Sequence, residues 1–300
     1  MKSPLRTTLL TIFAMLPLYG ALAETPAWTQ PQQPFRIYGN TYYVGTRGLS
    51  SIMIASSQGL VLIDGTLPQN AAQVEANIMA LGFDIADVKW IINSHAHFDH
   101  AGAIAQLARD SGARVAASSA GAKALMLGGK DPDDPQYGEA PAFAPIAKVT
   151  PVPDHGVVRL GDVTVTAHYT PGHTPGATTW TWRSCQAGLC MNIVYADSLG
   201  AFAADGYRFS DPEHPQRLEN YRRSIATIAS LPCDILLSPH PDQAAHFLER
   251  VAQRDAGAKP DPVIDGHACR TYAEEGRVKL ETRLAKEKGM ETGGGAHATP

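Results

Sequence analysis

The chain has 300 residues, of which 44% are apolar and 18% are charged, and its formal net charge is -4. This length allows a core of normal size, in one large domain or two small ones. The charge is mild, with no basic stripe and no run of five or more like charges, so nucleic acid is not expected as a partner.

The first 23 residues have the features of a secretory signal peptide. Lys2 and Arg6 make the start basic, residues 9–18 are mostly apolar, and Ala21-Leu22-Ala23 fits a small-residue cleavage site. The apolar stretch is short for a membrane span, and no cysteine near the cleavage site offers a lipid anchor. We therefore expect residues 1–23 to be removed and the mature protein to be periplasmic, without stable membrane association.

The first part of the mature chain alternates between strand-like and helical patterns. Short apolar runs separated by glycine predict strands, and a helical pattern begins at Pro68 and ends before Gly82. The predicted elements are strands 42–45, 51–55 and 60–63, a helix 68–81, a strand 88–92, a helix 101–109 and a strand 114–117. This alternation predicts an α/β architecture.

Residues 128–145 are rich in Gly, Pro and Asp and show no periodicity, as in a functional or disordered loop. We expect this loop and residues 45–50 to border a cleft. The elements predicted after it are strands 157–160, 163–169, 178–182, 192–196 and 234–237, and helices 215–229, 243–253 and 268–288. The Gly-rich tail, 289–300, is expected to be disordered, so the folded domain would span 24–288.

All four cysteines lie in the predicted mature chain. An even number in an exported protein predicts two disulfides, for which three pairings exist. Cys185 and Cys190 flank a turn-like segment that would allow a local bridge, which would leave Cys233 with Cys269. There is no CxxC pair, so a cysteine-rich zinc knuckle is not expected.

The motif His95-x-His97-x-Asp99-His100 follows an apolar strand and precedes a helical segment. Imidazoles together with a carboxylate suit zinc or a similar divalent ion. Four ligands on so short a turn would crowd one tetrahedral ion, so the motif favours two ions that each take further ligands from elsewhere.

Two later histidines are placed to complete such sites. His173 lies in a Pro-Gly-His-Thr-Pro-Gly turn, just past the strand predicted to end at residue 169. His240 lies in a Ser-Pro-His-Pro segment, just past the strand predicted to end at residue 237. Ligands of α/β sheets collect at the carboxyl ends of strands, so both are candidate metal ligands.

The HxHxDH motif, the PGHTPG turn and the late SPH together resemble the metallo-β-lactamase superfamily, over nearly the whole mature chain. The resemblance implies an αβ/βα sandwich, in which two mixed sheets pack together, helices cover the outer faces and the metal site lies at one edge. It implies that one zinc ion is held by His95, His97 and His173, and a second by Asp99, His100 and His240.

The segment Tyr195-Ala196-Asp197-Ser198-Leu199 bears on the branch of the superfamily. Glyoxalase II and the lactonases place a metal-bridging Asp here, and one group of β-lactamases places a Cys ligand. The segment is similar to the third subclass of metallo-β-lactamases, whose serine helps to bind the substrate carboxylate. Some members have a second serine where this chain has Gly200. The positions of the cysteines also resemble that subclass.

The resemblance thus implies hydrolysis of the β-lactam amide bond by a hydroxide that bridges two zinc ions, and resistance to β-lactam antibiotics. Asp99 would orient the nucleophile as well as bind zinc, and Ser198 would bind the substrate carboxylate. We expect a monomer whose partner is a small β-lactam. The sequence does not rank penicillins, cephalosporins and carbapenems.

Two other functions remain open. If Asp197 bridges the metals, the protein would be a glyoxalase II-like thioesterase or a lactonase, although export and disulfides favour the lactamases. A zinc-binding protein without catalysis would close each site with four protein ligands, whereas three ligands leave a position for water. A serine β-lactamase is not expected, because the chain has no Ser-x-x-Lys.

Overall fold

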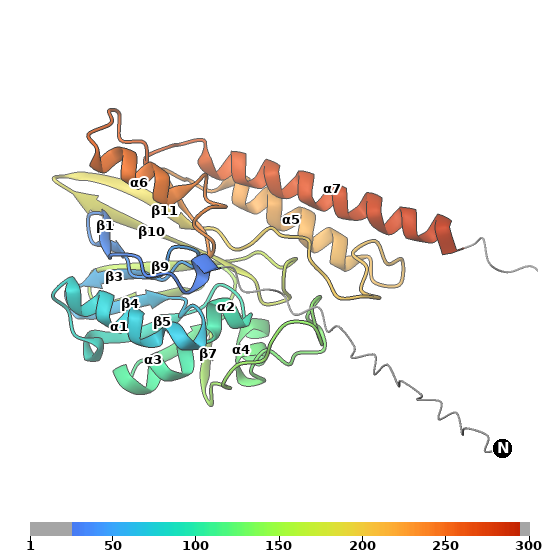
Figure 1. Ribbon diagram of the computed structural model, residues 1–300, viewed down its shortest axis with the longest axis horizontal. Coiled ribbons are helices and arrows are strands. Elements are labelled where there is room, and N and C mark those ends of the chain that lie inside the picture. Colours follow the sequence, from blue (N-terminus) through green and yellow to red (C-terminus); the bar gives the residue numbers. More distant parts are fainter. Residues whose placement is uncertain (1–25, 295–300) are drawn as a thin grey trace, which may run out of the picture.

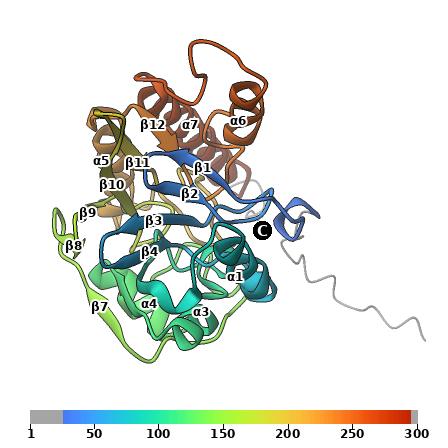
Figure 2. The same ribbon diagram turned by 90° about the vertical axis from the view of Figure 1, so that its left-hand side faces the viewer.

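A computed structural model describes residues 26–294, so the predicted signal peptide at residues 1–23 and the last six residues lie outside the described part. Two β-sheets pack face to face, and helices cover the outer side of each (Figure 1). The perpendicular view separates the same layers, with α1, α3 and α4 on one side and α5, α6 and α7 on the other (Figure 2). The predicted αβ/βα sandwich is confirmed.

The first sheet has its seven strands in sequence order. Neighbouring strands are antiparallel from β1 to β4 and parallel from β4 to β7. They are β1 (Phe35–Tyr38), β2 (Thr41–Tyr43), β3 (Ile52–Ser56), β4 (Gly59–Ile63), β5 (Val88–Ile92), β6 (Arg114–Ala117) and β7 (Val149–Pro151).

The second sheet has the order β12-β11-β10-β9-β8. It is antiparallel except for the parallel pair of β11 and β12. Its strands are β8 (Val157–Leu160), β9 (Val163–Tyr169), β10 (Thr178–Gln186), β11 (Leu189–Tyr195) and β12 (Ile235–Leu237).

The helices belong to one half of the molecule or the other. The first half contains α1 (Ala71–Ala80), α2 (Phe98–Ala101), α3 (Ile104–Ser111) and α4 (Ser119–Met126), with the 3-10 turns η1 (Pro26–Trp28), η2 (Pro68–Asn70) and η3 (Ile85–Asp87). The second half contains α5 (Gln216–Ser230), α6 (Phe247–Asp255) and α7 (Ala268–Gly294). Within residues 26–294, no helix combines the length and the apolarity that crossing a membrane requires.

The central strands are buried on both faces, and their side chains alternate between two apolar cores. On β3, Ile52 and Ile54 belong to the core that joins the two sheets, whereas Met53 belongs to the core beneath α1 and α3. On β4, Val61 and Leu62 divide in the same way. Successive side chains of a strand point to opposite faces, so one apolar run supplies both layers.

Most predicted elements are confirmed with shifted ends, but β1, β7, α2 and α4 were not predicted, because each is short and lacks a clear apolar period. Helix α6 begins at Phe247, later than predicted, because Ala245 and His246 adopt left-handed backbone angles that a helix cannot include. Helix α7 runs on to Gly294 instead of ending at Lys288, since a single glycine such as Gly289 costs a helix only about 1 kcal/mol and does not end it.

Both predicted disulfides are confirmed. Cys185 and Cys190 are cross-strand partners at the end of the β10–β11 hairpin, and they are bonded to each other. Cys233, just before β12, is bonded to Cys269 in the first turn of α7. The second bridge therefore fixes α7 to the strand that precedes His240.

Candidate metal centre

The histidine-rich turn after β5 is held in place by a buried carboxylate. Asp64, directly after β4, accepts hydrogen bonds from Asn93 Nδ2 at 2.8 Å, from the Ser94 amide at 2.8 Å and from Ser94 Oγ at 2.6 Å. Tyr195 Oη, from the second sheet, donates to the same carboxylate at 2.8 Å. Burial raises the pKa of Asp64 to about 6, so it is mostly ionised at neutral pH. Asp64 thus joins the histidine-rich turn to both sheets.

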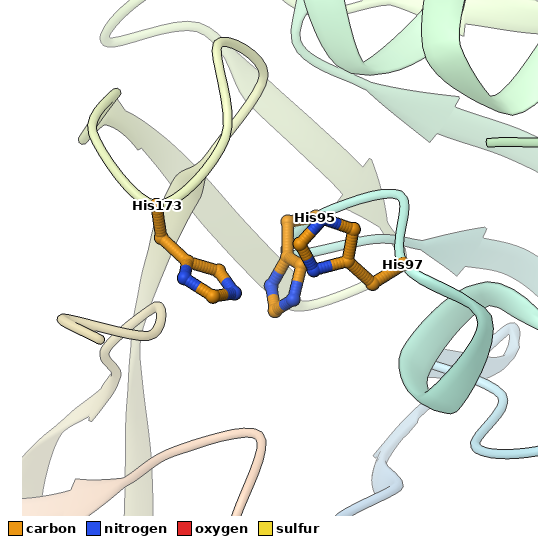
Figure 3. A group of neighbouring side chains, drawn as sticks. All are labelled: His95, His97 and His173. Atoms are coloured by element: carbon orange, nitrogen blue, oxygen red, sulfur yellow. The ribbon is translucent and has the colours of Figure 1, made fainter. Parts of the chain in front are cut away.

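The six predicted ligands converge in two groups. The first group, defined as His95, His97 and His173, and the second group, defined as Asp99, His100 and His240, each bring their ligand atoms within 4.8 Å of one another. Figure 3 shows the three imidazoles of the first group facing a common point from two separate loops. All six are buried except His240, which is partly exposed. The two groups adjoin, because the His95 and His100 rings lie 4.5 Å apart.

In the first group, the ring nitrogen that faces away from the centre is hydrogen-bonded to an acceptor. His95 Nδ1 donates to Asp197 Oδ1 at 2.7 Å, and His97 Nε2 contacts the Asp134 carboxylate at 3.1 Å. His173 Nδ1 donates to the Gly200 carbonyl at 2.8 Å. These acceptors fix the tautomer of each ring, so the second nitrogen is left as an electron-pair donor toward the centre.

In the second group, the Asp99 carboxylate lies against both imidazoles. Asp99 Oδ2 lies 3.1 Å from His100 Nε2 and 3.5 Å from His240 Nε2. The other ring nitrogen of His100, Nδ1, is buried and has no hydrogen-bond partner in the described part of the chain. His240 has a backbone hydrogen bond with Gly48 and packs against Trp28, so His100 is the second-group histidine whose outer nitrogen lacks an acceptor in the described part of the chain.

Burial sets the protonation of most of these groups. Together with the neighbouring imidazoles, it lowers the pKa of His173 to about 3 and that of His240 to about 4, and it lowers the pKa of His95 well below its usual value. Burial raises the pKa of Asp99, but the adjacent His100 outweighs it and holds that pKa well below its usual range. Neutral imidazoles and an ionised carboxylate are the forms that bind metal, so His95, His173, His240 and Asp99 are ready to do so. Burial also lowers the pKa of His100, but the adjacent Asp99 outweighs burial, so that pKa is instead raised.

The donor set fits divalent zinc. His95 Nε2 is buried without a hydrogen-bond partner among the described residues, as expected for a nitrogen that awaits a metal ion. Three imidazoles, or two with a carboxylate, are catalytic zinc sets that leave a fourth position for water. A structural site would need a fourth protein ligand, which neither group has among the described residues.

A cavity of about 460 Å³ opens over the two groups. Both loops expected to border a cleft contribute to it, through Arg47 of the first and Gln136 of the second. Ser198 also lines the cavity, as its predicted role in substrate binding requires. Further walls come from the aromatic residues Trp28 and Phe202.

Asp197 lies in neither ligand group. Its Oδ1 accepts the hydrogen bond from His95, and burial raises the pKa of its carboxyl to about 6. Its Oδ2 is buried and has no hydrogen-bond partner in residues 26–294. The Asp197 carboxylate thus contacts a ligand of the first group and is itself a member of neither group.

Sequence reasoning missed three residues that support the centre: Asp64, Asp134 and the Gly200 carbonyl. Asp64 could have been found, because an acidic residue directly after a buried strand stands where ligands and their supports collect. Asp134 is one of three aspartates in an aperiodic loop, and nothing in the sequence singles it out. A backbone carbonyl has no sequence signature at all.

Comparison with known proteins gives matches over most of the chain. A family model described as the metallo-beta-lactamase superfamily matches residues 44–240. Among solved structures, Rm3 metallo-beta-lactamase is 48% identical, with 87% of this chain and 97% of that chain covered and a TM-score of 0.84. MEM-A1, a subclass B3 metallo-beta-lactamase from a soil metagenome library, is 50% identical, with 88% and 99% covered and a TM-score of 0.84.

Matches to curated proteins are shorter. N-acyl homoserine lactonase AttM of Agrobacterium fabrum is 39% identical over 105 residues, which cover 33% of this chain and 37% of that protein. The matched part is thus little more than a third of these curated relatives. From the family model and the full-length structural matches, we conclude that the chain belongs to the metallo-β-lactamase superfamily, where its near structural relatives are subclass B3 enzymes.

Proposed function

We propose that this protein is a two-zinc hydrolase that opens the amide bond of β-lactam antibiotics. The observation that carries the proposal is the pair of adjoining ligand groups at one cavity, each with three protein ligands. The similarity to metallo-β-lactamases at 48–50% identity points to the β-lactam ring as substrate. The first group would hold one zinc ion and the second group the other.

Bound zinc would supply two things: a water molecule whose pKa is lowered to about 7, and polarisation of the lactam carbonyl. The chain's own residues position the reactants. Asp99 uses Oδ2 in the second group, and its other oxygen would accept a hydrogen bond from the attacking water. Asp197 and Asp134 hold His95 and His97 in the orientation that directs their free nitrogens inward.

Ser198 is proposed to bind the substrate rather than take part in the chemistry. Its side chain lines the cavity but belongs to neither ligand group. A hydroxyl at this wall would donate a hydrogen bond to the carboxylate that β-lactams carry next to the ring nitrogen. A hydrogen bond to a charged group contributes about 1.5–3 kcal/mol, so it would contribute chiefly to substrate affinity.

Lactone hydrolysis is the alternative, favoured by the partial match to AttM and by the buried Asp197 so close to the ligands. A lactonase of the kind considered above would use Asp197 as a metal bridge. The contact between Asp197 and His95 gives that carboxylate a different task, so we place β-lactam hydrolysis first.

The test is a substrate panel on the purified zinc-loaded protein: a carbapenem, a cephalosporin, a glutathione thioester and an N-acyl homoserine lactone. We expect turnover of the two β-lactams only, loss of it on chelation, and recovery when zinc is added back. Elemental analysis should give two zinc ions per chain. Full zinc content with no β-lactam turnover would contradict the proposal, and turnover of the lactone alone would replace it.

We also infer export to the periplasm as a monomer. Two disulfides are typical of proteins that fold in an oxidising compartment. Expression of the full chain in a bacterial host should give a periplasmic protein whose first residue is Glu24. A cytoplasmic protein that retains Met1 would contradict this inference, and light scattering of the mature protein tests the monomer.

A further inference from the structure

We propose that Phe202 is a specificity-determining residue, an apolar platform that favours β-lactams with a bulky apolar acyl side chain and occupies the space that a polar side chain at position 200 would need. The proposal rests on the proposed function and concerns which β-lactams the cavity prefers. It starts from an aromatic ring that the fold leaves uncovered beside the metal centre.

Phe202 is 62% exposed, although it lines the cavity. Its ring lies 6.3 Å from the His173 ring at an interplanar angle of 80°. The six ligands and Ser198 are all polar, so the ring offers a substrate apolar contact close to the first group. Covering an exposed aromatic ring with apolar surface is favourable, and a substrate would gain this contact on binding.

The ring packs directly over Gly200. A Cβ atom placed on Gly200 would lie 2.5 Å from Cε2 and 2.8 Å from Cδ2 of Phe202, closer than real Cβ contacts allow. A serine at position 200 would therefore require the ring to move away. With the ring in this position there is no room for a side chain at position 200, and an apolar surface stands where a polar anchor would be.

The loop that carries Phe202 is held on both sides of the ring. The Gly200 carbonyl accepts the hydrogen bond from His173 at 2.8 Å, and the Ala204 amide donates to the Pro135 carbonyl at 2.8 Å. The backbone that carries the ring is thus fixed to the metal centre and to the 128–145 loop. A platform fixed before substrate binds costs little conformational entropy.

A second aromatic residue stands next to the other ligand group. Trp28 packs against His240, with ring centroids 5.5 Å apart, and lines the same cavity. Trp28 and Phe202 therefore line the cavity beside different ligand groups, Trp28 at His240 and Phe202 at His173. Only Phe202 is coupled to position 200, so it is the ring that distinguishes this cavity from one with a second serine.

The experiment compares two penicillins with one nucleus: benzylpenicillin, which has a phenylacetyl side chain, and 6-aminopenicillanic acid, which has no acyl group. We expect F202A to raise KM for benzylpenicillin about five- to tenfold, to raise KM for 6-aminopenicillanic acid less than twofold, and to change kcat less than KM. F202Y keeps an aromatic ring at this position. It should therefore retain the wild-type KM ratio, defined as KM for 6-aminopenicillanic acid divided by KM for benzylpenicillin. M79A removes an exposed apolar side chain on α1, outside the cavity lining, and serves as the matched control.

G200S provides an independent arm, because it displaces the ring without removing it. It should reduce the KM ratio as F202A does, and F202A/G200S should show no further change. Zinc content is measured throughout, since the Gly200 carbonyl supports His173. An unchanged KM ratio in F202A, or an equal loss of kcat on both penicillins, would overturn the proposal while wild-type turnover keeps the lactamase function. Absence of wild-type turnover on either penicillin would contradict the proposed function itself.

Discussion

The two ligand groups differ in what holds them. Every histidine of the first group has its outer nitrogen hydrogen-bonded to a fixed acceptor, whereas His100 of the second group has a buried nitrogen without a partner in the described part of the chain. Residues that orient metal ligands typically contribute 10–100-fold to metal affinity. We therefore expect the first group to bind zinc more tightly and the second group to exchange it more readily.

The difference also separates two tasks. Three imidazoles held in place form a rigid site, whereas Asp99 adds a negative charge and a second oxygen that can act on the substrate side. The first group would thus serve mainly to retain an ion, and the second group to adjust the chemistry. Two substitutions test this division directly, and two more test the residues that surround the ligand groups.

The largest effect is expected from Asp99→Asn. Asparagine has nearly the same size but carries no charge and is a poorer ligand, so zinc in the second group should fall while the first group stays loaded. β-Lactam hydrolysis should drop at least ~100-fold, because the orientation of the nucleophile is lost along with the second ion. Metal content and carbapenem turnover, measured on one sample, check this. A mutant that has lost the second zinc but retains full activity would contradict the two-metal mechanism.

Asp134→Ala probes the support of the first group. Without its carboxylate contact, His97 is free to turn, and the zinc affinity of the first group should fall about 10- to 100-fold. Competition with a chromophoric chelator measures this without reference to activity. Asp133→Ala is the matched control, because that neighbouring carboxylate is exposed and pairs with Lys123. Equal zinc affinities of the two variants would show that Asp134 does not support the first group.

Ser198→Ala changes the cavity without touching either group. It should leave zinc content at the wild-type level and raise KM about tenfold or more, with a smaller effect on kcat. This change in KM corresponds to the loss of ~1.5–3 kcal/mol of binding free energy from one hydrogen bond to a charged group. Steady-state kinetics with one substrate of each β-lactam class check the expectation. If KM is unchanged for every substrate, Ser198 is a turn residue and the carboxylate is bound elsewhere.

The smallest effect is expected from Glu287→Gln, which loosens the far end of the loop that supports His173. The Glu287 carboxylate is 1% exposed and accepts hydrogen bonds from the Phe209 and Ser210 amides, and Arg283 pairs with it at 2.7 Å. The substitution should lower the free energy of unfolding by about 1–3 kcal/mol. Glu275→Gln, at an exposed position of the same helix, is the control.

The pH dependence of stability tests whether the charge of Glu287 stabilises the fold, beyond the packing of its side chain. The hydrogen bonds and the ion pair of this carboxylate are called the Glu287 clamp below. Burial raises the pKa of Glu287, but Ser210 and Arg283 outweigh it and hold the pKa below its usual value. The folded state therefore binds fewer protons than the unfolded state, and the clamp stabilises fully above the unfolded pKa of about 4.3. This contribution is lost as pH falls through the folded pKa. Denaturant titrations of the Gln variant should lack that part of the acid dependence.

The ligands could be predicted from sequence because their signal is local. Four of them lie within six residues, and His173 and His240 follow strands directly, so element type and order suffice to bring them together. The supports depend on where loops run after folding. Asp134 reaches His97 across 37 positions from a loop without periodicity, and no spacing rule anticipates that contact.

The direction in which individual side chains point could not be predicted from the sequence either. Asp197 could be recognised as important, but whether it faced a metal ion or a histidine depended on how β11 and β5 are placed in different sheets. The pairing of Gly200 with Phe202 has the same origin, because a close contact across an irregular loop leaves no pattern. By contrast, the β3 and β4 strands followed from apolar runs alone, since burial on both faces needs nothing more specific.

Each ligand group draws side chains from both halves of the sandwich: the turn after β5 supplies two ligands to each, and the loops after β9 and β12 supply His173 and His240. An ion in either group would therefore fasten one half to the other, and zinc binding and unfolding become linked equilibria. At a free zinc concentration 100 times the dissociation constant, each ion would add about 2.7 kcal/mol to stability. Where zinc is scarce, we expect such a protein to open more often and to be degraded sooner, so that its abundance would follow the zinc supply along with its activity.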